Sequence, residues 1–250
     1  MKKLLVVLLI LVALIAGGLW YIANNAGGFI KEQVETQGTA YLGTSVSLAN
    51  VDLNIGEGRL TLNDLDVENP QGFSNEDAFS LESVTLDLGD ISGEPYRVQS
   101  FSIAAPEMLY ELNATGTGNL MVLKDNLMKK LPKSSTPPKD SSASSPLVII
   151  DNVQVSKVRL KLDFENLDTA GFELPVDQRV YEVELPTFSI GGIGQPDGLP
   201  ADQVGAVIAN KLLDKVIDEA KAEAKRRAAD AAKEKLQDKA KEKLGELFGG

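Results

Sequence analysis

From Ser45 onward the chain alternates apolar and polar residues, which is typical of β-strands that bury one face. Two strands are predicted over residues 46–55 and 60–67, because the sequence Gly56-Glu57-Gly58 between them favours a turn. The sequence Asn69-Pro70-Gln71-Gly72 predicts the turn that follows. The same period returns in residues 81–88, 98–110 and 147–190. The pattern therefore predicts a mainly β fold with some α-helix.

Three segments contain a shift in this alternation. Residues 46–55, 60–67 and 153–164 each read h-x-h-x-x-h-x-h, where h is apolar. In a flat strand the shift would turn half of the apolar residues to the other face, whereas a β-bulge would keep them on one face and add curvature. A two-residue turn fits the first two segments equally well. The bulge is favoured in the third, because Ser156-Lys157 is poor turn chemistry.

A curved, bulged antiparallel sheet would collect the apolar residues of the first two strands on one concave face. The residues predicted to share this face are Val46, Leu48, Val51, Leu53, Leu60, Leu62, Leu65 and Val67. The alternation by itself does not determine whether such a face is a filled core or an open trough.

Helical periodicity marks three further segments. A short helix is predicted over residues 24–43, and another over residues 119–131, where leucines recur on one side. Residues 200–250 are rich in Ala, Lys and Glu and predict one long helix, continuous from about Ala201 to Leu244. We expect it to leave the body after roughly residue 220, and its end either is a solvated tail or docks on a partner protein or a membrane through Leu244, Leu247 and Phe248. Residues 132–146, rich in Pro, Ser and Lys, predict a disordered linker.

The first 27 residues predict a transmembrane anchor. The uncharged run from Leu4 to Ala23 would span about 30 Å as a helix, which is the thickness of a bilayer core. Lys2 and Lys3 precede the run, so the positive-inside rule places the N-terminus in the cytoplasm and the remaining chain outside it. The competing interpretation is a cleaved signal peptide, for which this run is long. We expect retention in the inner membrane as a single-pass protein with a periplasmic body.

Composition excludes several functions. The chain has no cysteine and no histidine, which removes the usual nucleophile–base pairs and every metal site that needs these ligands. The net charge of −11 without a basic patch argues against binding to nucleic acid. Asp87, Asp90 and Glu94 are oxygen ligands of the kind that calcium uses, but solvated turn carboxylates are the simpler interpretation. We therefore expect no enzymatic activity, no cofactor and no metal.

The order of several short motifs resembles the N-terminal region of the AsmA family. The motifs are Leu42-Gly43, the segments Val46–Leu48 and Val51–Leu53, the stretch from Gly58 to Phe73 with its Asn69-Pro70-Gln71-Gly72 turn, Ala105-Pro106 with Tyr110, and the step Gly118-Asn119-Leu120. A second block, with Ile149-Ile150-Asp151-Asn152, Leu185-Pro186 and Ile190-Gly191-Gly192, is similar to what small members carry after their linker.

The resemblance implies an architecture distantly related to chorein-type lipid-transfer proteins, in which curved sheets form an apolar groove. In that case residues 28–131 would be the AsmA-like region and residues 147–199 a second β block of the same sheet. The apolar residues from Val46 to Val67 named above would then line a lipid-binding groove. The implied function is binding of a phospholipid or a partner in envelope lipid homeostasis or transport. The alternative is a structural tether whose C-terminal helix docks a partner protein.

Overall fold

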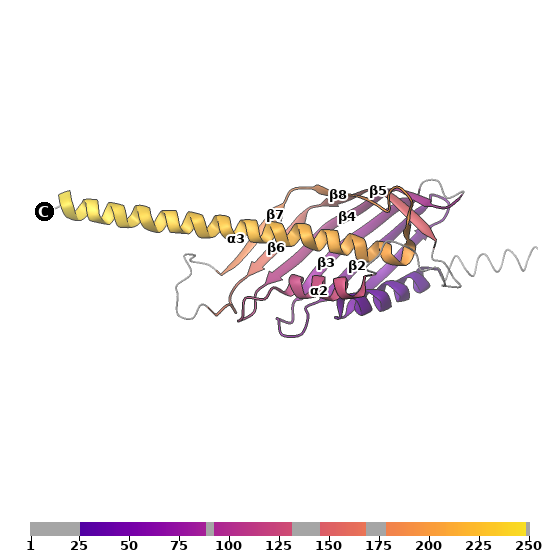
Figure 1. The fold of residues 1–250 in the computed structure, drawn as a ribbon, viewed down its shortest axis with the longest axis horizontal. Coiled ribbons are helices and arrows are strands. Elements are labelled where there is room, and N and C mark those ends of the chain that lie inside the picture. Colours follow the sequence, from indigo (N-terminus) through magenta and orange to yellow (C-terminus); the bar gives the residue numbers. More distant parts are fainter. Residues whose placement is uncertain (1–25, 89–92, 132–145, 169–178, 249–250) are drawn as a thin grey trace, which may run out of the picture.

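The computed structural model describes residues 26–88, 93–131, 146–168 and 179–248, and nine strands in these residues form one sheet (Figure 1). The strands are β1 (Val46–Asn54), β2 (Arg59–Glu68), β3 (Asp77–Leu88), β4 (Tyr96–Glu111), β5 (Leu147–Ser156), β6 (Val158–Asp163), β7 (Val180–Leu185), β8 (Phe188–Ile193) and β9 (Leu199–Pro200). The helices are residues 26–42, α2 (Asn119–Lys130) and α3 (Ala201–Phe248). With 48 residues in α3 alone, the fold is mixed α/β, so the prediction of a mainly β fold was too narrow.

The sheet is mostly antiparallel but contains a parallel seam. Strands β1 to β4 follow one another as antiparallel neighbours. The long strand β4 then pairs in parallel with both β5 and β6. A parallel neighbour requires a crossover connection, and the segment between β4 and β5 contains α2. The prediction of a wholly antiparallel sheet was therefore wrong at β4. Beyond this seam the pairing is antiparallel again, since β5 pairs with β8 and β9, and β6 pairs with β7.

A crease crosses the sheet where the alternation shifts. It is formed by Ala49, Asp64, Glu82, Ala105 and Lys157, which lie at the same level of five successive strand segments. Asp64, Ala105 and Lys157 adopt φ values of 50°, 47° and 57°, a region that residues other than glycine seldom occupy. The strand register is the same on both sides of the crease, whereas a β-bulge sets two residues against one. The expected bulges, and the alternative turns, are thus replaced by one extra residue at the same level of each of these five strand segments.

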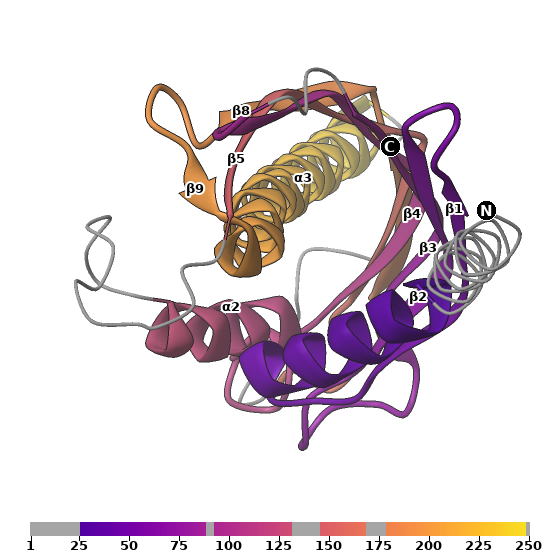
Figure 2. The same ribbon diagram turned by 90° about the vertical axis from the view of Figure 1, so that its right-hand side faces the viewer.

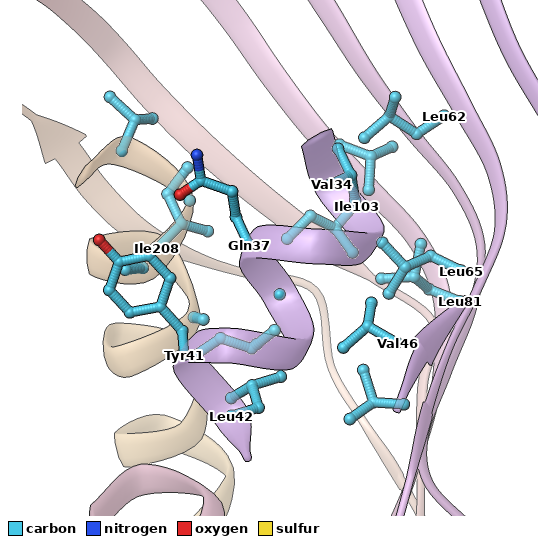
Figure 3. A pocket seen from close by; sticks show the side chains of 18 of the residues that line it. Val34, Gln37, Tyr41, Leu42, Val46, Leu62, Leu65, Leu81, Ile103 and Ile208 are labelled. Atoms are coloured by element: carbon cyan, nitrogen blue, oxygen red, sulfur yellow. The ribbon is translucent and has the colours of Figure 1, made fainter. Parts of the chain in front are cut away.

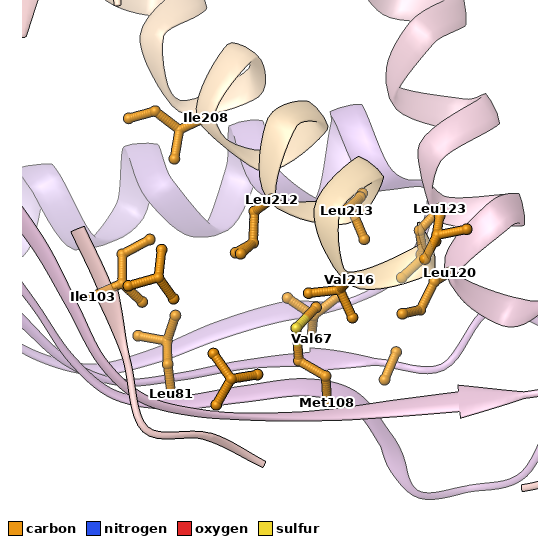
Figure 4. Close-up of a cluster of buried hydrophobic side chains, with 14 of the residues drawn as sticks. Val67, Leu81, Ile103, Met108, Leu120, Leu123, Ile208, Leu212, Leu213 and Val216 are labelled. Carbon is orange, nitrogen blue, oxygen red and sulfur yellow. The ribbon is translucent and has the colours of Figure 1, made fainter. Parts of the chain in front are cut away.

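The sheet curves around α3, which runs along the inside of the arc, while α2 and the helix of residues 26–42 lie across its open side (Figure 2). Apolar residues of α3 pack on the concave face and on α2 (Figure 4). Ile208, Leu212 and Val216 of α3 are each at most 5 % exposed, as are Leu120 and Leu123 of α2. The concave face is therefore covered by helices along much of its length.

The helix of residues 26–42 covers the outer edge of β1. The Val46 N–H donates to Thr39 Oγ1 at 3.1 Å, the Leu48 N–H donates to Glu35 Oε1 at 2.9 Å, and Lys31 Nζ donates to the Ala49 carbonyl at 3.3 Å. These three side chains are four residues apart and so lie on one side of the helix. An uncovered edge strand can pair with a strand of another chain. By occupying backbone groups of β1, this helix hinders such pairing at that edge.

Helix α3 packs against the rest of the protein over a longer stretch than the sequence predicted. Ala220 is fully buried, Glu223 is 8 % exposed, and the Arg227 guanidinium lies 4.4 Å from the centre of the Tyr181 ring. Most described side chains after residue 228 are exposed, including Leu236 at 69 %. The helix is continuous, as predicted, but it leaves the body about two turns later than residue 220.

Among the described residues, no helix combines the length and apolar character needed to cross a membrane. The predicted anchor of residues 4–23 lies outside them, and so does the predicted linker apart from Pro146.

Candidate functional site

An apolar cavity of about 460 Å³ lies between the helix of residues 26–42, the first turns of α3 and the concave side of β1 to β4 (Figure 3). Its sheet wall includes Leu62, Leu65 and Ile103, and Ile208 contributes from α3. Leu123 and Leu127 of α2 close one side. The cavity is the part of the trough that α3 leaves unfilled.

The helix of residues 26–42 forms the outer wall of the cavity. Its lining residues share one face of the helix, because they recur at helical spacing. These residues are Ile30, Gln33, Val34, Gln37, Gly38, Tyr41 and Leu42. At Gly38 the helix comes so close to the sheet that a side-chain Cβ would lie 3.0 Å from Val46 Cγ1. Asn126 Nδ2 of α2 donates to the Leu42 carbonyl at 2.9 Å and fixes the end of the helix.

Five of the eight predicted groove residues line the cavity: Val46, Leu60, Leu62, Leu65 and Val67. Leu48 is 1 % exposed and pairs with Leu65, but it does not line the cavity. Val51 and Leu53 are half-buried opposite Leu62 and Leu60 and also lie outside the lining. The side chains of Leu60, Leu62, Leu65 and Val67 face one space although the alternation shifts between them, because the crease restores their orientation.

Strands β3 and β4 supply lining residues that the sequence prediction did not include. Phe79, Leu81, Val84 and Leu86 come from β3, and Phe101, Ile103 and Met108 come from β4. The signal was present in residues 79–86, which also read h-x-h-x-x-h-x-h, and was weaker in residues 101–108, where Ala104, Ala105 and Pro106 stand at the centre of the segment. The residues from the helices carry no comparable signal, because their position depends on how the helices pack against the sheet.

Polar groups of the cavity lie at its rim. Gln33, Gln37 and Asp202 line the cavity and are exposed, whereas Tyr41 is half-buried. In Figure 3 the amide of Gln37 and the hydroxyl of Tyr41 lie on the side of α3, away from the leucines of the sheet. An apolar interior with a few polar groups at its opening suits an amphipathic ligand.

Of the possible calcium ligands Asp87, Asp90 and Glu94, the structure describes Asp87 and Glu94. The described residues contain no cluster of carboxylates that could hold a metal ion. Arg59 donates to Asp87 Oδ1 at 2.8 Å and Ser100 donates to Oδ2 at 2.9 Å, and these hydrogen bonds lower the pKa of the Asp87 carboxyl. Glu94 is exposed, and Asp90 lies outside the described residues. Asp87 is thus a partner of an arginine on the sheet surface.

Comparison with known proteins gave no match to a family model, to a curated protein or to a solved structure.

Proposed function

We propose that this chain is a non-enzymatic envelope protein that holds the apolar part of a lipid in the cavity between residues 26–42, α3 and strands β1 to β4. The observation that carries the proposal is an apolar cavity of about 460 Å³ whose polar groups lie at the rim. This volume lies within the range of about 300–1,000 Å³ for small-molecule sites. Each methylene group transferred from water into such a space contributes roughly 0.8 kcal/mol.

The proposal places the protein in envelope lipid homeostasis or transport, with an architecture akin to the AsmA family. The order of motifs between Leu42 and Leu120 supports this relationship, together with the concave apolar face that they form. A groove that continued past the ends of the sheet would favour transfer between membranes. Here residues 26–42 cover one edge at β1, which favours capture of lipid within a single body.

Lipid capture is tested by purifying the full chain in detergent and analysing an organic extract by mass spectrometry. We expect lipid in a ratio near one per chain. Leu62→Trp should lower this ratio several-fold, because the half-buried Leu62 faces the cavity and a larger side chain can occupy it. Thr61→Trp is the matched control, since neighbouring strand residues point to opposite faces. Extracts without lipid, or equal amounts in both variants, would count against the proposal.

The proposed location is the inner membrane, with residues 4–23 as the anchor and the body in the periplasm. A reporter that is active only after export, fused at residue 40, should be active. Cytoplasmic activity of the reporter would overturn this location.

A second candidate function is a tether whose C-terminal helix docks a partner protein. It is favoured by the exposure of α3 beyond residue 228, where Leu236 is 69 % exposed. The two functions differ in their response to Leu62→Trp. A tether would keep its partner in this variant, whereas a lipid carrier would lose its cargo.

A further inference from the structure

We infer that the end of the body where the helix of residues 26–42 begins is a membrane-contact surface, and that Phe29, Ile55 and Leu88 enter the headgroup layer of the bilayer there. The inference rests on the proposed location, because it needs residues 4–23 to be anchored in that bilayer. It adds which end of the body meets the membrane and which side chains make the contact.

The helix and β1 run in opposite directions, so the start of the helix lies beside the end of the strand. A Cβ at Gly27 would lie 3.0 Å from the Val51 carbonyl oxygen, whereas near the end of the helix Thr39 Oγ1 accepts from the Val46 N–H. The turn between β1 and β2 therefore lies at the end of the body where the helix begins. Figure 2 views the body from this end.

The sequence before the helix limits how far this end can lie from the bilayer. The uncharged run from Leu4 to Ala23 stops three residues before Ala26. Three extended residues reach at most about 11 Å, and the headgroup layer on each side of the hydrocarbon core is about 5–8 Å thick. Phe29 follows Ala26 within one helical turn, a rise of about 5 Å. With the run in the bilayer, the first turn of the helix is held at the membrane surface.

Large apolar side chains are exposed at this end. Phe29 is 64 % exposed, Ile55 in the turn after β1 is 68 % exposed, and Leu88 at the end of β3 is 38 % exposed. The Leu88 N–H donates to the Gly58 carbonyl at 2.8 Å, so Leu88 lies beside the same turn. Single exposed apolar residues are common, but these three share the end that the anchor holds at the bilayer. The membrane interface removes such side chains from water.

The charged groups at this end indicate a contact that does not need anionic lipid. Arg59 pairs with Glu57 at 3.1 Å and with Asp87 at 2.8 Å, and Arg97 at the start of β4 pairs with Asp151 at 2.7 Å. These pairs carry no net positive charge that would attract an anionic headgroup. The contact therefore depends on the apolar side chains and should form on a zwitterionic bilayer.

The contact surface adjoins the cavity. Ile30, next to Phe29, lines the cavity wall, and so does Leu86, two residues before Leu88. Docking of this end therefore brings the apolar cavity next to the bilayer that would supply its lipid.

The test exploits the absence of cysteine, which allows one environment-sensitive fluorophore to be attached at a chosen position. The full chain with Ile55→Cys is labelled and embedded in nanodiscs of phosphatidylcholine that carries a nitroxide on its acyl chain. Relative to nanodiscs without nitroxide, fluorescence should fall at least about twofold, because residue 55 reaches the boundary between headgroups and acyl chains. Phe29→Cys should behave in the same way. Leu236→Cys is the matched control, since Leu236 is 69 % exposed but lies on the projecting part of α3, and its label should change little.

Phe29→Ser combined with Leu88→Ser tests whether the side chains make the contact. The two changes should restore most of the fluorescence lost at residue 55. Unchanged quenching would mean that the anchor alone brings residue 55 to the lipid, and it would overturn the inference. Equal quenching at residues 55 and 236, or none at residue 55 in embedded chains, would also overturn it, and all three results leave the proposed lipid cavity intact. A chain that does not embed in nanodiscs would overturn both the inference and the proposed location.

Discussion

At the end of β4, Glu111 is 2 % exposed, and the contacts that hold its carboxylate are neutral. Ser74 donates to Glu111 Oε2 from its hydroxyl at 2.7 Å and from its backbone N–H at 3.0 Å. Asn69 Nδ2 donates to the same oxygen at 3.1 Å, and Asn166 Nδ2 donates to Oε1 at 3.3 Å. One carboxylate thus joins the turn after β2, the end of β4 and the segment after β6.

Asn119 extends this buried network to α2. Its Nδ2 donates to Asn69 Oδ1 at 2.7 Å and to the Leu109 carbonyl at 2.8 Å, and its Oδ1 accepts from the Glu111 N–H at 2.9 Å. Both sequence motifs that contain these asparagines, Asn69-Pro70-Gln71-Gly72 and Gly118-Asn119-Leu120, therefore have a structural role. They set where α2 begins relative to the concave face, and so they position one wall of the cavity.

Replacing Glu111 by leucine should destabilise the fold strongly. The change removes the acceptor shared by the half-buried Ser74 and Asn69 and the exposed Asn166. Hydrogen bonds to a charged group contribute about 1.5–3 kcal/mol each. We expect the free energy of unfolding to fall by on the order of 3 kcal/mol or more, measured by chemical denaturation.

Glu107→Leu is the matched control for that prediction, because Glu107 lies on the same strand but is exposed and pairs with Arg159 at the surface. Exposed ion pairs contribute about 0–1 kcal/mol, so this control should change stability little. Equal effects of the two substitutions would mean that the buried network contributes no more than a surface pair.

At the scale of elements, α3 divides into a docked part and a projecting arm, and Glu223 marks the boundary. Burial disfavours the charged form of this carboxyl, but hydrogen bonds from Arg227 and Arg226 outweigh it and hold the pKa below its ordinary value. A carboxyl with a lowered pKa in the folded state stabilises that state above its ordinary pKa, and this contribution is lost as the pH falls through the folded value. Arg227 in turn lies over Tyr181 of β7 and completes the attachment.

Amide exchange should report this division directly. We expect slow exchange in residues 206–223 at neutral pH and fast exchange beyond residue 230, where few side chains are buried. Glu223→Ala should speed exchange over residues 220–227 and leave residues 206–217 protected. Glu219→Ala is the control, since Glu219 forms an exposed pair with Lys215 at 2.7 Å. Slow exchange throughout residues 230–241 of the isolated chain would show that the arm is packed on something.

At the scale of the whole molecule, one sheet joins segments from both sides of the predicted linker, residues 132–146. Strands β5 and β6 pair along β4, with Phe101 opposite Val153 and Met108 opposite Leu160. Helix α3, which follows the second segment, packs on α2 of the first, and Leu123 of α2 belongs to the same buried cluster as residues of α3. Each segment by itself would leave a large apolar face uncovered.

Cutting the chain between the two segments should therefore leave them together. A protease site inserted within residues 132–146 should be cleaved, and the two fragments should still co-elute in gel filtration. Val153→Asp, which places a charge at a fully buried position beside β4, should make the cleaved fragments separate. Gln154→Asp, at the neighbouring exposed position, should leave them associated. Separation of the unaltered fragments would contradict the single sheet.

Local features were determined by the sequence itself, because they depend on neighbours along the chain. The alternation predicts the strands, the shift at Asn63-Asp64 and Ser156-Lys157 locates the crease, and residues rich in Ala, Lys and Glu form α3. Leu60, Leu62, Leu65 and Val67 share a face as predicted. The sequence of one strand could not tell a β-bulge from the crease. The two differ only in whether the partner strand also carries an extra residue at the same level.

The parallel seam and the cavity were decided by the tertiary structure. The direction in which β5 returns to β4 depends on the crossover through α2, and an apolar alternation reads the same for either direction. The same alternation also suits a filled core and an open trough, since a leucine on the concave face can meet a helix or a ligand. Helix α3 covers much of the concave face, and a cavity remains between residues 26–42 and the side chains of Leu60 and Leu62. The space that remains depends on where three helices pack, which no single segment of the sequence specifies.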